Sequence, residues 1–209
     1  MPTGERVRAG AVPLLADGFS ARPETAAALE SALVPGATVL LAPGRATPGR
    51  SGAWLEACGK TQLAASSAEW LWHSGKVGLL VWAAATSRAS VLSAYVEAAV
   101  RATGADPAGD AETVAGRFLT WLAETSQQWV VVLDDLSSPA DLEGLRPEGP
   151  AGRVIITTRN ATVIPPDLRP LVLQLGAFSP REAQSISSRT LATIRWRWPR
   201  PAPLSRVRC

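Results

Sequence analysis

The chain has 209 residues, which is long enough for one α/β domain with a substantial core and too short for two domains of full size. Its 46% apolar and 19% charged residues are typical of a soluble globular protein, and no run approaches the eighteen or so apolar residues of a membrane helix. The net charge of +3 is unevenly distributed, since six arginines and no acidic residue follow Glu182, which leaves 15 basic and 18 acidic residues in positions 1–182. The body of the chain is therefore mildly acidic, and its basic character belongs to the last residues.

The first residues argue against a secretory leader, because Pro13 interrupts the apolar stretch at 9–16 and Asp17 closes it. The two cysteines, Cys58 and Cys209, do not make a disulfide framework, and a reducing compartment is the simpler interpretation. We therefore expect a cytoplasmic protein that has no membrane among its partners.

Helical patterns alternate with short apolar runs along most of the chain. The predicted elements are, in chain order, helix 23–33, strand 38–42, helix 60–74, strand 77–85, helices 87–103 and 111–125, and strands 129–133, 153–157 and 171–175. The strand segments are continuously apolar instead of alternating, which indicates burial on both faces. The sequence therefore predicts an α/β fold with three αβα layers and a mostly parallel sheet.

The first candidate site is the tripeptide Gly59-Lys60-Thr61, at the start of the helix predicted at 60–74. A glycine-rich turn into a helix N-terminus presents backbone N–H groups that converge on a phosphate. Lys60 would reach the β- and γ-phosphates of a nucleotide, and the Thr61 hydroxyl would ligate Mg²⁺. The tripeptide alone is common, and an ordinary helix start is the alternative interpretation.

The spacing before this tripeptide departs from the P-loop motif G-x-x-x-x-G-K-[ST]. The motif needs glycine at position 54, which holds Trp54. Gly44 would begin a loop with ten inserted residues, and Gly52 would begin a loop with two. Both assignments stay open at this point, as does the competence of the long phosphate loop.

Two acidic residues, Asp134 and Asp135, follow the apolar strand predicted at 129–133. In an open α/β sheet, ligands bind outside the carboxyl ends of the strands. We therefore expect Asp134 to meet Thr61 around Mg²⁺, and Asp135 to act as the catalytic residue that orients the attacking water. A strand followed by a polar turn is the alternative, but the separation of about 70 residues from the tripeptide makes the joint occurrence much less accidental.

The strand predicted at 153–157 ends in hydroxyl groups and a cation at the same edge of the sheet. Arg159 would sense a γ-phosphate through charge-assisted hydrogen bonds. A surface arginine after a strand is the alternative, and it would be preferred if this segment stood alone.

Four segments, C-G-K-T-Q-L-A, W-V-V-V-L-D-D-L, G-R-V-I-I-T-T-R-N and L-G-A-F-S-P-R-E-A, occur in this order. They resemble the NB-ARC branch of the STAND signalling ATPases, most closely actinobacterial regulators with tetratricopeptide repeats, over about residues 12–184. The resemblance implies a P-loop NTPase that binds ATP or ADP with Mg²⁺, and it implies that the segment around Arg22 lies over the adenine. The predicted nucleotide-binding residues are Gly59, Lys60, Thr61, Gln62 and Arg159, the predicted metal ligands are Thr61 and Asp134, and the predicted catalytic residue is Asp135.

We divide the chain into an amino-terminal segment at 1–35, a P-loop nucleotide-binding domain at 36–184 and a tail at 185–209. The tail has no strand or helix period and is dense in Arg, Pro and Trp, a composition typical of a GC-rich gene read out of frame. We expect a disordered or frameshifted tail, on a chain truncated after its nucleotide-binding core. The family continues into a lid, a winged helix and an effector region, which we do not expect in this chain. Although arginines alternate with tryptophans at 195–198, we do not expect nucleic acid as a partner.

The predicted function is adenine-nucleotide binding with slow Mg²⁺-dependent hydrolysis at most, since an expanded phosphate loop argues against fast hydrolysis. ATP is preferred over GTP by the resemblance alone. We expect protein partners or self-association to act through the family's further domains, which we expect to be missing here. The rival hypothesis is a non-catalytic interaction or scaffold module with a degenerate P-loop.

Overall fold

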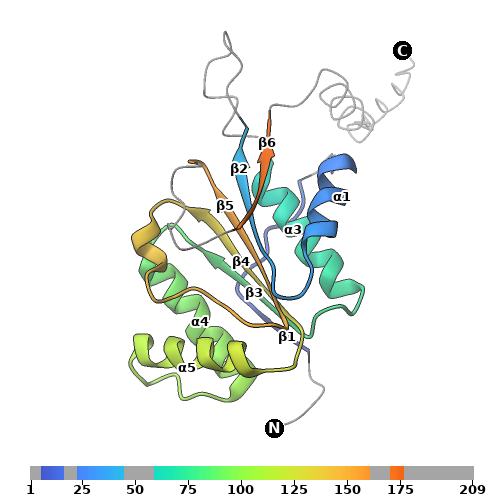
Figure 1. Ribbon diagram of the computed structural model, residues 1–209. Helices are drawn as coiled ribbons and strands as arrows, with labels where there is room; N and C mark the ends of the chain where they lie inside the picture. Colours follow the sequence, from blue (N-terminus) through green and yellow to red (C-terminus); the bar gives the residue numbers. More distant parts are fainter. Residues whose placement is uncertain (1–5, 17–22, 45–58, 161–169, 177–209) are drawn as a thin grey trace, which may run out of the picture.

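The computed structural model describes residues 6–16, 23–44, 59–160 and 170–176. The strands of this described part form a six-stranded sheet in the order β1-β3-β4-β5-β2-β6 (Figure 1). The strands are β1 Val7–Ala9, β2 Thr38–Pro43, β3 Leu79–Ala84, β4 Trp129–Leu136, β5 Gly152–Thr158 and β6 Leu171–Leu175. Each pair of neighbours is parallel, which confirms the predicted α/β fold with a mostly parallel sheet.

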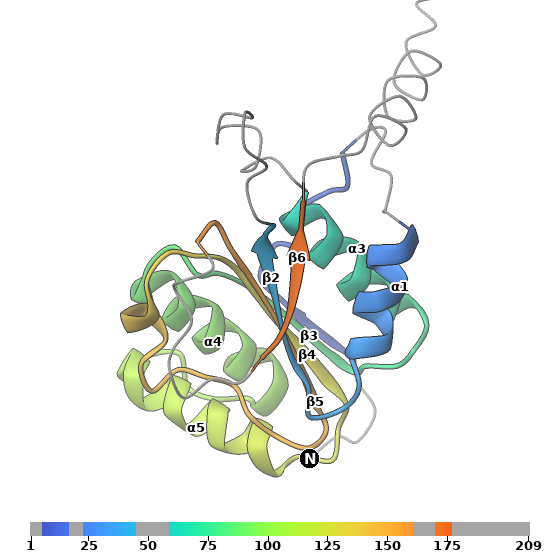
Figure 2. The same ribbon diagram turned by 45° about the horizontal axis from the view of Figure 1, so that its top comes forward.

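Helices cover both faces of the sheet and complete the three layers. The α-helices are α1 Pro23–Ala32, α3 Lys60–His73, α4 Arg88–Thr103 and α5 Ala111–Glu124, and a 3-10 helix, η1 Pro139–Leu142, follows β4. Figure 2 shows α1 and α3 on one face and α4 and α5 on the other. The starts of α4 and α5 are fixed by side-chain caps, since Ser87 accepts from the Ser90 N–H and Asp110 from the Thr113 N–H. None of the described helices is long and apolar enough to cross a membrane.

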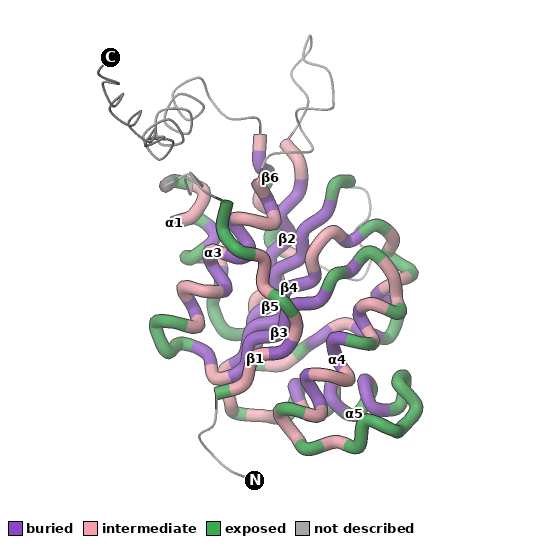
Figure 3. The backbone as a smooth tube through the Cα atoms, turned by 180° about the vertical axis from the view of Figure 1, so that it is seen from behind, coloured by how far each residue is buried: buried purple, intermediate pink, exposed green. Residues whose placement is uncertain are grey.

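The sheet is buried on both faces because successive residues of a strand point to opposite layers. In β4, Val131 and Leu133 join the core under α4 and α5, while Val130 and Val132 join the core under α1 and α3. All four side chains are 0% exposed. Figure 3 shows the strands as the buried centre of the molecule. This double burial explains why the segments of the central strands are continuously apolar. The prediction of burial on both faces is wrong for β6 at the edge of the sheet, where Leu171 is 54% and Val172 40% exposed.

The sheet has a strand that the sequence does not predict, because no strand is expected before residue 38. Val7 of β1 pairs with Leu79 of β3, and the Val7 N–H donates to the Gly78 carbonyl at 2.8 Å. A strand of three residues, Val, Arg and Ala, has no period of its own. β1 therefore depends on the edge that β3 offers and not on a local pattern.

The strand order determines where the sheet offers a site. From β2 the chain passes through α3 to β3, which is separated from β2 by β5 and β4, whereas β6 lies on the other side of β2. The sheet is thus extended in opposite directions from β2. In open α/β sheets, ligands bind outside the carboxyl ends of the strands at such a switch point. The start of α3 and the ends of β4 and β5 lie at this edge.

Candidate functional site

The start of α3 is suited to an anion. The helix begins at Lys60, directly after Gly59, whose backbone is in the left-handed region with φ 75° and ψ 22°. Glycine adopts this conformation without strain, and it has no side chain that could cap the helix. The N–H groups of the first turn therefore depend on other acceptors, and the helix dipole favours negative charge there. Lys60 adds a cation at the same place, and the residue is only 6% exposed.

The end of β4 carries a β-bulge that contains both predicted acidic residues. Leu133 pairs with Ile156 and Leu136 with Thr158, so Asp134 and Asp135 together oppose a single residue of β5. Asp135 has a φ of 60°, and among the described non-glycine residues it alone has a positive φ. Successive residues of a regular strand point to opposite faces. The bulge changes this, and both carboxylates line the same cavity.

The carboxylate of Asp134 joins three elements through hydrogen bonds. Its Oδ1 accepts from the Thr61 hydroxyl of α3 at 2.8 Å and from the Thr157 hydroxyl of β5 at 2.6 Å. The same Thr157 oxygen accepts from the Asp135 N–H at 2.8 Å. Thr157 is 1% exposed. Its hydroxyl therefore fixes both members of the acidic pair from within the sheet.

Arg159 and Asp135 form a two-pronged ion pair at the mouth of the site. The guanidinium Nε donates to Asp135 Oδ1 at 2.8 Å, and Nη2 donates to Oδ2 at 3.0 Å. The arginine side chain is 65% exposed and the aspartate side chain is 33% exposed. Bidentate geometry of this kind is among the stronger arrangements of an arginine and a carboxylate.

One cavity of about 370 Å³ brings these groups together. It is lined by Gly59, Lys60, Thr61, Gln62, Asp134, Asp135, Thr157 and Arg159. Every site residue predicted from the sequence is among them, although the predicted elements that carry these residues are far apart in the chain. Their roles toward a nucleotide and a metal ion stay predictions.

Gln62 lines the cavity, but its amide also holds the amino-terminal segment. The side-chain oxygen accepts from the Ala16 N–H at 2.6 Å, and Nε2 donates to the Leu14 carbonyl at 3.2 Å. These two bonds attach the chain at 14–16 to the first turn of α3. The sequence offers no local pattern for this contact.

Thr157 is the site residue that sequence reasoning did not include. The sequence places its hydroxyl at the correct edge of the sheet, because it ends the strand predicted at 153–157. Its two bonds to the acidic pair depend on the bulge at Asp134 and Asp135, which has no pattern in the local sequence. A threonine at the end of a strand next to an acidic strand end is the signal that points to it.

The oxygens of Thr61 and Asp134 lie at a hydrogen-bond distance that two adjacent ligands of a Mg²⁺ ion could also have. Two ligands at right angles on an octahedral Mg²⁺, each at about 2.0–2.1 Å, lie about 2.9 Å apart. The distance between Thr61 Oγ1 and Asp134 Oδ1 is 2.8 Å. Magnesium usually takes one or two protein oxygens and completes its shell with water and phosphate oxygens. Within the described ranges, no group of three or more His, Cys, Asp or Glu could hold a metal ion.

Several predicted features lie outside the described residues. They are the phosphate loop at 45–58, the segment around Arg22 and the tail at 185–209. Gly44 is described, and its N–H donates to the Leu175 carbonyl at 2.8 Å. A Cβ on Gly44 would lie 2.9 Å from the Cα of Gly176, so this position accepts no larger residue without movement. The choice between Gly44 and Gly52 as the first glycine of the loop stays open.

No protein-family model matches the chain, and no curated protein matches it. Solved structures do resemble it. The Aeropyrum pernix ORC2 protein, in its ADPNP–ADP complexes, has a TM-score of 0.53 at 18% identity, and the match covers 83% of this chain. The match covers 53% of that protein, so this chain spans about half its length. The Drosophila ORC bound to GC-rich DNA and Cdc6 has a TM-score of 0.47 at 10% identity, over 79% of this chain and 30% of that one.

The likeness to the Aeropyrum pernix protein concerns the fold. The sheet of parallel strands between two helical layers is an α/β fold, and this agrees with the fold class predicted from the sequence.

Proposed function

We propose that this chain binds an adenine nucleotide, ATP or ADP, together with Mg²⁺ at the start of α3, and that it hydrolyses ATP slowly at most. The observation that carries this proposal is the hydrogen bond between Thr61 and Asp134 beside the largely buried Lys60. A hydroxyl at a helix start, an acidic strand end and a lysine are the three groups that a P-loop site needs around the phosphates.

The phosphates would lie at the first turn of α3. The backbone N–H groups there and the helix dipole favour an anion, and the Lys60 ammonium would bind the β- and γ-phosphates. Mg²⁺ would be held by Thr61 and Asp134, and it would neutralise charge on the phosphate oxygens. When bound, it would supply the electrostatic stabilisation on which phosphoryl transfer depends.

Hydrolysis would depend on Asp135 as the residue that orients the water. In the structure this carboxylate is bonded to Arg159, so its two oxygens are engaged by a cation. While this ion pair persists, the carboxylate is a poor acceptor for a proton from water. The expectation of slow hydrolysis rests on the phosphate loop, which is longer than that of the P-loop motif.

The finer identity, a STAND-type ATPase core of the NB-ARC branch, rests on the four sequence segments that resemble that family. The same resemblance, together with the adenine nucleotides named for the Aeropyrum pernix structure, supports ATP and ADP over GTP. We also propose the division into 1–35, 36–184 and 185–209, a cytoplasmic location, and protein partners or self-association through further domains.

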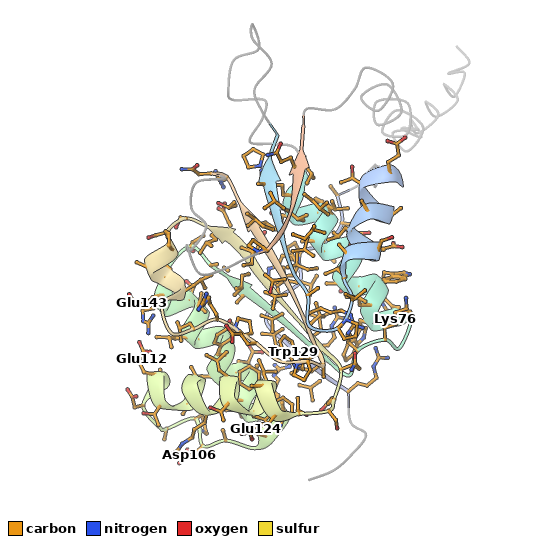
Figure 4. The ribbon with its side chains drawn as sticks, viewed as in Figure 1. Lys76, Asp106, Glu112, Glu124, Trp129 and Glu143 are labelled. Atoms are coloured by element: carbon orange, nitrogen blue, oxygen red, sulfur yellow. The ribbon has the colours of Figure 1, made fainter. Side chains whose placement is uncertain are left out.

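The test is isothermal titration of ATP and ADP, with Mg²⁺, into the purified chain and its Lys60→Ala variant. Lys76→Ala is the matched control, because Lys76 follows the far end of α3 (Figure 4). Its ammonium lies over the Trp70 ring, 3.8 Å from the ring centroid. We expect binding by the native chain and by Lys76→Ala, and a loss of most of the affinity in Lys60→Ala.

Circular dichroism of each variant establishes that the chain is folded. If the folded native chain binds neither nucleotide, the proposed function is wrong, and the scaffold hypothesis takes its place. If Lys60→Ala and Lys76→Ala weaken binding equally, the phosphates do not lie at the start of α3.

A further inference from the structure

The ion pair between Asp135 and Arg159 sets a condition on any nucleotide with a third phosphate. Both residues line the proposed phosphate cavity, and both oxygens of the carboxylate accept from one guanidinium. Arg159 is also the residue predicted to contact the γ-phosphate. One planar guanidinium would thus serve two anions that bind it in the same bidentate way.

Asp135 is the fixed member of this pair. It lies within the β-bulge of β4, where its N–H donates to Thr157, a residue that is only 1% exposed. Its positive φ of 60° is held by the sheet on both sides of the bulge. Because the aspartate side chain is short, the carboxylate stays close to this fixed backbone when the guanidinium moves.

Arg159 can change partner through its side chain alone. Its backbone neighbours are fixed, since the Thr158 hydroxyl donates to the Leu136 carbonyl at 2.7 Å and accepts from the Asn160 N–H at 3.1 Å. The arginine side chain, in contrast, is 65% exposed. Rotation about its side-chain bonds needs no movement of the sheet.

We infer that Asp135 is a specificity-determining residue, whose carboxylate competes with the γ-phosphate for Arg159 and so shifts the preference of the site from ATP toward ADP. This inference rests on the proposed function. A γ-phosphate that draws Arg159 away leaves the Asp135 carboxylate without its cation, next to a new negative charge. ADP has no third phosphate and leaves the ion pair intact, so the cost applies to ATP alone.

The size of the effect follows from the exposure of the pair. An ion pair of this exposure contributes only a small free energy in water. Loss of the pair therefore changes a binding constant by about twofold to fivefold. The expected quantity is therefore the ratio of the ATP-analogue affinity to the ADP affinity, because this ratio cancels changes that affect both nucleotides.

The test is a double-mutant cycle on the full chain with Asp135→Asn, Arg159→Gln and the double variant. Asparagine tolerates a positive φ and preserves the shape of the side chain. Isothermal titration measures ADP and a non-hydrolysable ATP analogue, each with Mg²⁺. Glu148→Gln is the control for loss of one negative charge, since Glu148 is a 74% exposed side chain away from this cavity.

Asp135→Asn also removes plain repulsion between the carboxylate and the γ-phosphate, and the cycle separates this effect from competition. Removal of this repulsion alone would raise the affinity ratio by the same factor whether Arg159 is present or replaced by Gln. Competition predicts that Asp135→Asn raises the ratio by a further factor of about two to five when Arg159 is present. Glu148→Gln should leave the ratio unchanged.

The inference is overturned, while the proposed function stands, if Asp135→Asn raises the ratio no more with Arg159 present than with Arg159→Gln. That outcome would mean that Arg159 binds both anions together or neither. Failure of the folded native chain to bind either nucleotide overturns the proposed function and this inference with it.

Discussion

The Thr61 hydroxyl donates a hydrogen bond of 2.8 Å to Asp134 Oδ1, across 73 positions of sequence. This contact joins the first turn of α3 to the end of β4, the two elements that the sequence predicts to share a metal ion. Their oxygens are as far apart as two adjacent ligands of Mg²⁺.

The first prediction concerns the dependence of nucleotide affinity on Mg²⁺. Thr61→Val removes the hydroxyl and preserves the shape of the side chain, so we expect nucleotide binding that Mg²⁺ no longer strengthens. Thr61→Ser is the matched control, because it retains the hydroxyl. Isothermal titration of ADP with Mg²⁺ and with EDTA measures the effect. If Mg²⁺ strengthens binding by Thr61→Val as much as by the native chain, Thr61 is not a ligand of the ion.

The second prediction concerns Thr157, whose single hydroxyl bonds to both acidic residues. Thr157→Val leaves the Asp135 N–H without this acceptor, and we expect a loss of about 1–3 kcal/mol in the free energy of unfolding. Thr157→Ser retains the hydroxyl and loses a methyl group, at a cost of about 0.8 kcal/mol. Urea denaturation compares the two variants. A serine variant less stable than the valine variant would mean that packing of the methyl group, and not the hydroxyl, matters at this position.

Most of the fold follows from the sequence because its central strands are buried on both faces. A run such as 129–133 needs no knowledge of its neighbours to be recognised as a strand, and the acidic residues after it are placed by the general rule for parallel sheets. The cavity at the start of α3 could therefore be expected, with Lys60, Thr61 and Asp134 in it.

Other features depend on contacts between distant segments. The bulge places the side chains of Asp134 and Asp135 in the same cavity, and it appears only when β4 is aligned with β5. β1 exists because β3 offers an edge, and the attachment of Gln62 to the segment at 14–16 joins residues that are 46 and 48 positions apart. Local patterns carry no information about such pairs.

The third prediction concerns the close approach of Gly152 to Trp129. A Cβ on Gly152 would lie 1.9 Å from the Trp129 ring, which is fixed by a hydrogen bond of 3.1 Å from Nε1 to the Leu122 carbonyl. Figure 4 shows Trp129 in the interior, at the end of the sheet away from the site. Gly152→Ala must displace this ring or the strand, so we expect a loss of about 1–3 kcal/mol or more in the free energy of unfolding.

Gly116→Ala is the matched control for this substitution. Gly116 lies within α5, and a Cβ there would meet no atom within 4 Å. Alanine in a helix is better than glycine by about 0.5–1 kcal/mol, so this variant should be more stable than the native chain. Urea denaturation of both variants gives opposite shifts if the contact with Trp129 is the cause. Two shifts of the same sign would contradict the prediction.

The fourth prediction concerns the stability of the chain at alkaline pH. Tyr95 is 0% exposed, and its hydroxyl donates to the Leu145 carbonyl at 3.0 Å. Burial raises the pKa of this phenol well above its ordinary value of about 10, because the charged phenolate would lose its hydration. In the unfolded chain the phenol loses its proton above pH about 10, whereas in the folded chain it retains it.

The contribution of Tyr95 to the free energy of unfolding is therefore complete below pH about 10. Above that pH it decreases by about 1.4 kcal/mol for each pH unit. Tyr95 is the single tyrosine of the chain, so the ultraviolet absorbance of tyrosinate reports on it alone. We expect this absorbance to appear together with unfolding, and later in pH than in the urea-denatured chain. Tyr95→Phe should be less stable at neutral pH by about 1 kcal/mol, since the Leu145 carbonyl loses its donor, but its stability should decrease less steeply above pH about 10. A native chain that forms tyrosinate near pH 10 while still folded would show that the phenol is accessible to water, and it would remove the reason for the difference in slope.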